Sequence, residues 1–239
     1  MTEPREILVI GGTGGLGSAV ATGHLGVEGA SVTVTGATQA EVETARADPR
    51  LAAARVVRLD VRDDEAVRTL VDGFDRLDVL VNAAGIAASP TDFTVEGFER
   101  SIDINVHGTM RACFAAHRLL EASEGSILNF ASMMSFRGSA TGPAYAAGKG
   151  AILQLTASLA AAWAPRVRVN AIAPGFMDTP LTKNIQADTA RNERLMGRVP
   201  AGRWGDPEDL VSAALFLTAA SSRFVTGVTL PVDGGYLTT

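Results

Sequence analysis

The sequence predicts an α/β protein in which a central parallel sheet is flanked by helices on both faces. Short apolar runs at residues 7–10, 31–35, 77–81 and 125–131 have the length and composition of buried strands. Segments with helical character separate them, and no internal repeat, low-complexity tract or linker interrupts the alternation. Six or seven strands that alternate with helices in this way indicate one doubly wound domain over residues 1–239.

The composition limits the classes of partner. A chain of 239 residues is long enough for one sizeable core and short for two domains. The net charge is −5 and no basic run occurs, so we expect no nucleic-acid partner. Cys113 is the only cysteine, which leaves no intrachain disulfide and no cysteine-based metal site, and favours a reducing, cytoplasmic location. Four strongly apolar residues before Gly11 are too few for a membrane span, and we expect neither a membrane nor a metal partner.

A glycine-rich loop follows the first predicted strand and precedes a predicted helix. Glycine permits unusual backbone angles and a close approach of the main chain, and a helix N-terminus favours a phosphate group. The loop therefore predicts a pyrophosphate site. Two glycine registers fit this loop, Gly12-x-Gly14-x-x-Gly17 and Gly11-x3-Gly15-x-Gly17.

Tyr145 and Lys149 stand four residues apart on a predicted helix that begins at Pro143, so they share one face of it. The reference pKa of a phenol is ~10, and a neighbouring ammonium group favours the phenolate and lowers that pKa. We therefore expect Tyr145 to donate and accept a proton. Ser132 ends the strand at residues 125–131 and is expected to bind a substrate oxygen beside Tyr145.

These motifs together resemble the signature of the short-chain dehydrogenase/reductase family. The matching elements run in order over essentially the whole chain: the glycine loop, Asn82-Ala83-Ala84-Gly85, Asn105, Ser132, Tyr145-x-x-x-Lys149 and Pro174-Gly175. The resemblance implies a Rossmann fold and an NAD(P)(H)-dependent oxidoreductase that interconverts a secondary alcohol and a ketone. It favours the register Gly11-x3-Gly15-x-Gly17. The chain departs from the family at Ile10, where a Thr is usual, and at Ala83, where a second Asn is usual.

The resemblance assigns four catalytic residues. Tyr145 exchanges a proton with the substrate oxygen, and Ser132 orients that oxygen. Lys149 lowers the pKa of Tyr145 and holds the nicotinamide ribose. Asn105 lies in a predicted helical stretch at residues 94–122, 27 positions before Ser132. Family members use this Asn to hold a water that connects the lysine to solvent.

The resemblance also implies a cofactor site. Family members place an acid at the end of the third strand against adenine, the Asn-Ala-Ala-Gly element against the adenosine ribose, and the Pro-Gly turn with a following Thr against nicotinamide. The hydroxyl of Thr13 is expected to replace the loop hydrogen bond of the missing Thr. The cofactor-binding residues carried over are Gly11, Thr13, Gly15, Leu16, Gly17, Gly36, Ala37, Thr38, Asp60, Val61, Asn82, Ala83, Ala84, Gly85, Tyr145, Lys149, Pro174, Gly175 and Thr179.

The end of the second strand bears on the choice between NAD and NADP. An acid here binds the 2′-hydroxyl of NAD, and a nearby Arg accommodates the 2′-phosphate of NADP. Gly36-Ala37-Thr38-Gln39 carries neither. The missing carboxylate removes a repulsion against phosphate, and Thr38 offers a hydroxyl. NADP is therefore mildly favoured, with dual use equally defensible.

Three substrate classes are left open. Residues 132–138, 203–205 and 230–236 resemble the gluconate and deoxygluconate dehydrogenase branch, in which Arg137 would meet a substrate carboxylate. The arginines within residues 179–203 instead suit the acidic carrier of a 3-oxoacyl-carrier reductase. A third class, a carbonyl reductase for bulky ketones, would use an apolar pocket lined by Met133, Met134, Phe136, Phe176 and Met177.

Two expectations concern movement and assembly. Residues 179–203 are polar, rich in arginine and irregular, which predicts a mobile substrate lid. The resemblance implies a homotetramer, or a homodimer, with the C-terminal end of the chain at an interface. A rival interpretation is a catalytically inactive dinucleotide-binding sensor. The presence of both Tyr145 and Lys149 argues against it.

Overall fold

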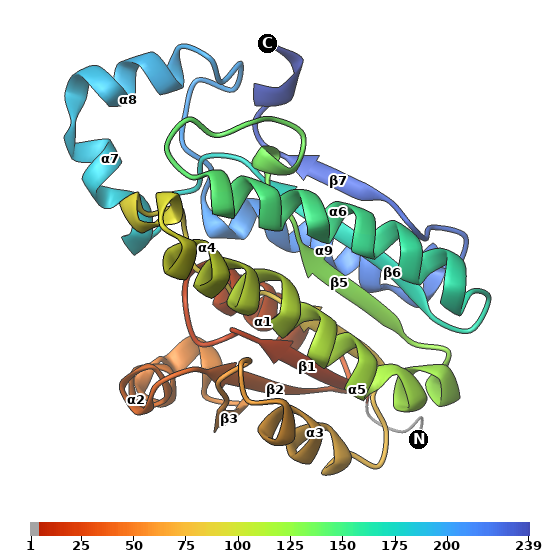
Figure 1. The fold of residues 1–239 in the computed structure, drawn as a ribbon. Helices are drawn as coiled ribbons and strands as arrows, with labels where there is room; N and C mark the ends of the chain where they lie inside the picture. Colours follow the sequence, from red (N-terminus) through yellow and green to blue (C-terminus); the bar gives the residue numbers. More distant parts are fainter. Residues whose placement is uncertain (1–4) are drawn as a thin grey trace.

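The computed structural model describes residues 5–239 and confirms the predicted fold class (Figure 1). Its seven strands are all parallel and lie in the order β3-β2-β1-β4-β5-β6-β7, so the chain reverses direction across the sheet between β1 and β4. The strands are β1 (Arg5–Ile10), β2 (Ala30–Gly36), β3 (Arg55–Arg58), β4 (Val79–Asn82), β5 (Ser126–Phe130), β6 (Arg168–Pro174) and β7 (Thr229–Val232).

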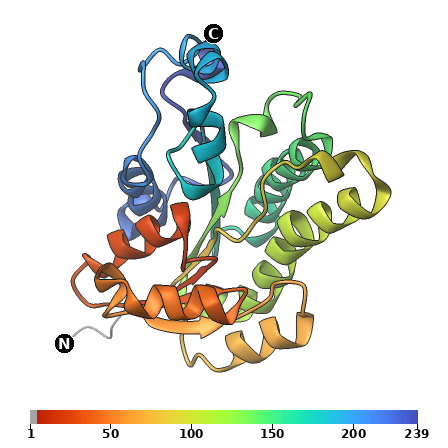
Figure 2. The same cartoon turned by 90° about the vertical axis from the view of Figure 1, so that its left-hand side faces the viewer.

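Helices cover both faces of the sheet in two layers, which Figure 2 shows edge-on. Helices α1 (Gly15–Leu25), α2 (Gln39–Ala47) and α9 (Val211–Thr218) pack on one face. Helices α3 (Asp64–Asp72), α4 (Val95–Ile102), α5 (Gly108–Ser123) and α6 (Pro143–Trp163) cover the other face. The predicted doubly wound arrangement is therefore present.

Strand β1 shows how the sequence builds both layers. Successive side chains of a strand point to opposite faces of a sheet. Leu8 and Ile10 accordingly pack in the core cluster with α3 and α5, whereas Ile7 and Val9 pack with α1 and α9. All four side chains are buried, and each stabilises the fold by about 1.5–3 kcal/mol.

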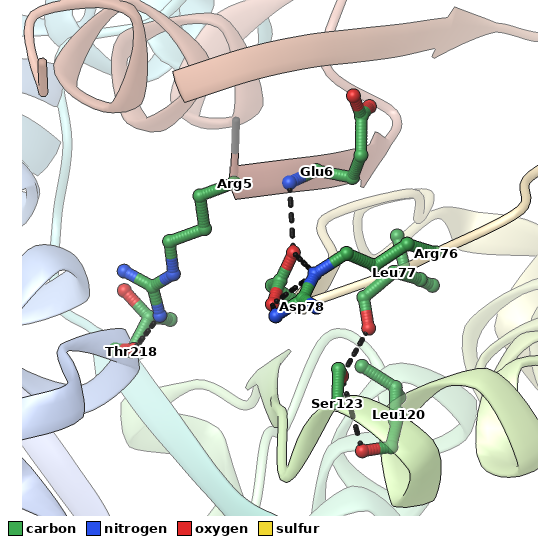
Figure 3. A network of polar contacts seen from close by, with 8 residues as sticks. All are labelled: Arg5, Glu6, Arg76, Leu77, Asp78, Leu120, Ser123 and Thr218. Carbon is green, nitrogen blue, oxygen red and sulfur yellow. Dashed lines mark hydrogen bonds and ion pairs between the residues drawn. The ribbon is translucent and has the colours of Figure 1, made fainter. Parts of the chain in front are cut away.

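Polar contacts close the end of the sheet at which the strands begin (Figure 3). Arg76 donates to both carboxylate oxygens of Asp78, and Asp78 also accepts the backbone N–H of Glu6 at 2.9 Å. The guanidinium of Arg5 donates to the carbonyl oxygen of Thr218, at the C-terminus of α9, where a cation is favoured. Ligands of such sheets bind at the opposite end, outside the carboxyl ends of the strands.

The helical stretch predicted at residues 94–122 is divided in the structure. Helix α4 ends at Ile102, a π-helical turn occupies Asp103–His107, and α5 continues from Gly108. Asn105 lies in the π-helical turn and is 1% exposed. A π-turn inserts one residue into the helical repeat, and apolar spacing alone did not reveal it.

Two short helices, α7 (Lys183–Ala187) and α8 (Thr189–Met196), project from the body of the protein beyond the carboxyl ends of the strands (Figure 1). Every residue of both helices is half-buried or exposed. Among residues 5–239, no helix combines the length and the apolar composition needed to cross a membrane.

Candidate active site

The glycine loop is held against the end of β4 by contacts that exclude side chains. Gly11 has a positive φ of 78°, and a β-carbon there would lie 2.5 Å from the backbone nitrogen of Ala84. A β-carbon at Gly17 would lie 2.2 Å from the carbonyl oxygen of Gly11. At Gly14 and Gly15, in contrast, no described atom lies within 4 Å of such a β-carbon.

This open space lies at the N-terminus of α1, and it fits a pyrophosphate group. Gly14 is the N-cap of α1, and its lack of a side chain leaves the first backbone N–H groups of the helix without a side-chain cap. Such groups bind phosphate oxygens, and the helix dipole favours the negative charge. Gly15, exposed with a φ of 49°, begins this helix, and the half-buried Leu16 packs against the α1 side of the core.

Two threonines fasten the loop to the end of β2. Thr35 accepts the backbone N–H of Gly11 on its hydroxyl at 3.1 Å, and Thr13 donates its hydroxyl to the carbonyl of Thr35 at 3.3 Å. Thr13 therefore supplies a loop hydrogen bond, as expected. The partner Thr35 was not predicted, because sequence spacing does not show which residue of β2 faces the loop.

The end of β2 carries a carboxylate that the sequence prediction missed. Thr38 is the N-cap of α2 and accepts the backbone N–H of Glu41 at 3.2 Å. The Glu41 carboxylate in turn accepts the N–H of Ala37 at 2.7 Å. A β-carbon at Gly36 would lie 3.0 Å from the β-carbon of Glu41. An acid is therefore present here, brought from the first turn of α2 and not from the residues just after the strand.

Asp60 and Val61 lie just beyond the end of β3. Both oxygens of Asp60 accept hydrogen bonds from the guanidinium of Arg62, at 2.6–3.1 Å. These bonds are the main cause that lowers the pKa of Asp60, so the carboxylate stays charged. Val61 is buried, and its carbonyl accepts a hydrogen bond from Arg111 at 3.2 Å. The partnership with Arg62 was not anticipated.

Asn82 joins β4 to β5 through a buried polar network. Its Nδ2 donates to Oδ1 of Asn129 at 2.9 Å and to the sulfur of Cys113 at 3.3 Å. Asn129 donates to the hydroxyl of Thr156 on α6 at 3.0 Å. These bonds fix the register of the two central strands against α6. Burial raises the pKa of Cys113 to about 12, which leaves its thiol protonated and unreactive.

Gly85 borders two of the predicted catalytic residues. A β-carbon at Gly85 would lie 2.8 Å from Oδ1 of Asn105 and 3.9 Å from Nζ of Lys149. The side chain of Asn105 pairs with both backbone groups of Ile86: its Oδ1 accepts the N–H at 2.8 Å and its Nδ2 donates to the carbonyl at 3.1 Å. The structure thus brings Asn105, Lys149 and the loop after β4 together.

Ser132 follows β5 and caps a short 3-10 turn at Met133–Ser135. Its hydroxyl accepts the N–H of Met134 at 3.2 Å and is hydrogen-bonded to the Tyr145 side chain. Ser135, which the sequence did not indicate, donates its hydroxyl to the carbonyl of Lys149 at 2.6 Å and accepts the N–H of Ser132 at 3.2 Å. The Ser135 hydroxyl therefore connects the turn that follows Ser132 to helix α6, which carries Tyr145 and Lys149.

Burial shifts the pKa of both Tyr145 and Lys149 towards the neutral form. Burial raises the pKa of Tyr145, and the hydrogen bond with Ser132 partly offsets this effect. Burial lowers the pKa of Lys149 to about 8. Its Nζ donates to the carbonyl of Phe130 at 2.7 Å and lies 5.8 Å from the centre of the Tyr145 ring. The sequence predicted a lowered pKa for Tyr145. The direction is opposite here because desolvation is the largest effect on both groups.

The turn after β6 places Pro174, Gly175 and Thr179 at the same end of the sheet. Gly175 donates its N–H to the carbonyl of Val232 at 3.0 Å, and a β-carbon there would lie 2.6 Å from Cα of Asp233. Thr179 is buried and precedes the 3-10 turn Pro180–Thr182.

Backbone hydrogen bonds join the residues that flank the segment 179–203. Asp178 donates its N–H to the carbonyl of Gly205 at 2.7 Å, and Gly205 donates to Phe176 at 2.9 Å. Trp204 donates its indole N–H to Asn192 of α8 at 2.7 Å. The two ends of the segment are therefore joined, while α7 and α8 lie outside the core.

Arg137 and the apolar residues near it have defined neighbours. Arg137 donates to the carbonyl of Thr239 at 3.1 Å, and its guanidinium lies 5.4 Å from the centre of the Tyr236 ring. Met133 is buried with Tyr236 in one small cluster, and Met177 is buried in the main core. Within residues 5–239 we find no group of histidine, cysteine and acidic side chains that could hold a metal ion.

Comparisons with known proteins agree with this geometry. Residues 11–237 match a family model described as enoyl-(acyl carrier protein) reductase. A 2-dehydro-3-deoxy-D-gluconate 5-dehydrogenase of Bacillus subtilis is 39% identical over 186 residues, which are 75% of this chain and 73% of that protein.

Solved structures extend the likeness to nearly the whole chain. A gluconate 5-dehydrogenase from Burkholderia cenocepacia in complex with NADP and tartrate superposes with a TM-score of 0.90 at 34% identity, covering 99% of this chain and 96% of that one. A short-chain type dehydrogenase/reductase from Mycobacterium ulcerans gives a TM-score of 0.89 at 30% identity, covering 99% and 90%. With the glycine loop and the Ser132, Tyr145 and Lys149 cluster already in place, the conclusion is direct: this chain belongs to the short-chain dehydrogenase/reductase family, whose members are NAD(P)-dependent oxidoreductases acting on CH–OH groups.

Proposed function

We propose that this protein interconverts a secondary alcohol and a ketone on a small sugar acid. NADP(H) is mildly favoured over NAD(H), because the gluconate 5-dehydrogenase from Burkholderia cenocepacia is in complex with NADP. The observation that carries the proposal is the meeting of Ser132, Tyr145 and Lys149 where β5 ends and α6 begins. Both the serine and the lysine are buried, and the open glycine loop lies at the same end of the sheet.

The catalytic roles follow from these positions. A bound nicotinamide supplies or accepts the hydride. Tyr145, a neutral phenol held by Ser132, gives its proton to the substrate oxygen in reduction and recovers it in oxidation. Ser132 orients that oxygen through its hydroxyl. Lys149, whose pKa of about 8 lies near neutral pH, passes the proton onward, and Asn105 beside Gly85 completes the relay.

The proposed cofactor site runs along one end of the sheet. The open space at Gly14 and Gly15 supports a pyrophosphate at the start of α1. The remaining residues carried over from the family follow the ends of β2, β3, β4 and β6, and this common edge supports their assignment to ribose, adenine and nicotinamide.

We assign residues 179–203 as a lid within a single domain. The backbone pairing of Met177 with Gly205 supports two fixed hinge points, and the half-buried or exposed α7 and α8 between them support movement. Lys183 pairs with Asp178 at 2.6 Å, so one charged contact would have to change when the lid moves.

A sugar acid is favoured by two guanidinium groups. Arg137 lies five residues after Ser132, and Arg198 lies in the proposed lid. Both stack on the ring of Tyr236, at 5.4 and 4.7 Å from its centre. Planar guanidinium groups bind carboxylates in bidentate fashion. The two solved or curated relatives named for gluconate-type substrates support the same class. A carbonyl reductase for apolar ketones is the second candidate, favoured by the exposed ring of Phe136.

The test is an absorbance assay at the nicotinamide band with both cofactors. D-Gluconate and 2-dehydro-3-deoxy-D-gluconate are compared with sorbitol, which has similar hydroxyl groups and no carboxylate, and with cyclohexanone. Turnover of the acids at least 10-fold above sorbitol supports the proposal, and an Arg198→Met variant should remove that difference. Turnover of cyclohexanone alone would replace the sugar acid by an apolar ketone. Silence with both cofactors would overturn the proposed reaction and restore the sensor interpretation.

We also propose that copies of the chain associate as a homotetramer, or a homodimer, in the cytoplasm. Exposed aromatic rings support an interface on two faces. Phe98 and Phe114 lie on α4 and α5, where Phe114 packs edge-on against Trp163, and Phe216 and Phe224 lie on and after α9. Light scattering after size-exclusion chromatography gives the mass directly, and a mass of one chain would contradict this assembly. The single buried cysteine supports the reducing location.

A further inference from the structure

The catalytic helix α6 begins without a capping side chain of its own. The first backbone N–H groups of a helix have no partner inside it, and the side chain of the N-cap residue commonly accepts one of them. Gly142 is the N-cap of α6 and has no side chain, and Pro143 fills the first helical position. Tyr145 is the third residue of the helix, so its own N–H is one of those that need an acceptor.

Asp92 supplies this acceptor from a distant part of the chain. Its Oδ2 accepts the backbone N–H of Tyr145 at 3.0 Å, and its Oδ1 accepts the N–H of Ser89 at 3.1 Å. The side chain is 4% exposed. A carboxylate is favoured at a helix N-terminus by the dipole, and here both of its oxygens are held. Asp92 is thus fixed by Ser89 and in turn fixes the first turn of the catalytic helix.

The segment at residues 86–92, which carries Asp92, packs closely against the start of α6. A β-carbon at Gly142 would lie 2.3 Å from the β-carbon of Ala88 and 3.3 Å from Oδ2 of Asp92. Only glycine allows this approach. At its other end, the segment holds Asn105 through the two backbone groups of Ile86. Residues 86–92 therefore connect the proposed proton relay with the residue that carries the proton.

We propose that Asp92 is a positioning residue, which sets the Tyr145 phenol against Ser132 by fixing the first turn of α6. The proposal rests on the function proposed above for Tyr145. It adds a residue that lies 53 positions away in the sequence and holds the backbone of the acid. The side chain of Tyr145 moves with its own backbone, so a turn free to shift by about 1 Å costs on the order of 10²-fold in rate.

The test compares Asp92→Ala with Asp63→Ala. Asp63 is a control for the loss of a helix-capping carboxylate, because it accepts the N–H of Ala66 at 3.0 Å in the first turn of α3, away from the site. Both variants should lower the thermal midpoint, and Asp92→Ala by more, because Asp92 is buried and Asp63 is exposed. Only Asp92→Ala should lower kcat, by about 10- to 100-fold, with the Kd of the cofactor changed less than 2-fold. Asp92→Asn keeps one acceptor oxygen, so its kcat should lie between those of the wild type and Asp92→Ala.

A second readout does not depend on turnover. The chain has two tyrosines, so the ultraviolet titration of Tyr145 follows from the difference between each protein and its Tyr145→Phe version. Burial raises the pKa of Tyr145, and a loosened turn admits water, so the titration of Asp92→Ala should shift to lower pH. If this shift appears while no substrate is turned over, the positioning role stands and the proposed function fails. Equal kcat values and equal titrations in the two alanine variants would overturn the inference.

Discussion

The burial of Lys149 predicts that the active site weakens the fold. Lys149 is 6% exposed, and its ammonium group donates a hydrogen bond to the carbonyl of Phe130. Burial lowers its pKa to about 8 from the ordinary lysine value of 10.5. Between these values the unfolded chain binds more protons than the folded protein, so the free energy of unfolding rises as pH rises through this window. Lys149→Met removes the charge and should remove this dependence.

The magnitude follows from the two pKa values. At pH 7 the charged lysine costs about 3 kcal/mol of stability, and about 1 kcal/mol of this cost remains at pH 9.5. The free energy of unfolding of the wild type should therefore gain about 2 kcal/mol relative to Lys149→Met over this range. At pH 7 the variant gains less than about 3 kcal/mol over the wild type, because it also loses the hydrogen bond to Phe130, and a charged hydrogen bond contributes about 1.5–3 kcal/mol.

Urea unfolding at pH 7 and pH 9.5 measures both free energies. Lys183 is the other lysine of the chain and provides a control. It is exposed and paired with Asp178, so Lys183→Met should follow the wild type at both pH values. The argument would be refuted if the difference in free energy of unfolding between the wild type and Lys149→Met stayed constant with pH. Burial of the charged ammonium group would then not cost stability.

Three further outcomes are expected. His24 is buried, neither of its ring nitrogens has a partner within the described residues, and burial lowers its pKa to about 4. The free energy of unfolding should therefore fall by about 2 kcal/mol as pH drops from 7 to 5. In urea unfolding, the His24→Leu variant should not show this loss. Glu41→Gln removes the negative charge beside the Ala37 N–H. In fluorescence titrations, the ratio of the Kd of NADPH to the Kd of NADH should therefore fall at least 5-fold. An unchanged ratio would mean that the 2′-phosphate binds away from Glu41. Gly17→Ala forces a β-carbon to within 2.2 Å of the Gly11 carbonyl, which should cost about 1–3 kcal/mol and weaken cofactor binding at least 10-fold; a variant that binds normally would show that the loop adapts freely.

The fold followed from the sequence because its signals are local. Buried parallel strands read as short apolar runs, and Ile7 to Ile10 is buried as predicted. Glycines that precede a helix mark a close backbone approach, and Gly11 and Gly17 make one. Family membership followed from the order of such motifs along the chain.

Contacts between distant segments escaped the sequence prediction. Asp92, Ser135 and Thr35 have no motif of their own, and their value lies in partners 53, 14 and 24 positions away. Glu41 escaped because it lies in the first turn of α2, four residues after the Ala37 whose N–H it accepts, and not directly after the strand. The direction of the Tyr145 pKa escaped because desolvation depends on the packed site and not on the spacing of Tyr145 and Lys149.

The central claim is that the Tyr145 phenol carries the proton of the reaction. The most direct test is the Tyr145→Phe variant, measured for kcat on the best substrate of the panel and for the Kd of the cofactor by fluorescence. General acid–base catalysis contributes on the order of 10²–10⁴-fold to a rate, so kcat should fall by at least about 10²-fold. The Kd of the cofactor should stay within about 2-fold of the wild-type value. A variant that retains the wild-type kcat would contradict the account, because the proton would then come from a group other than Tyr145.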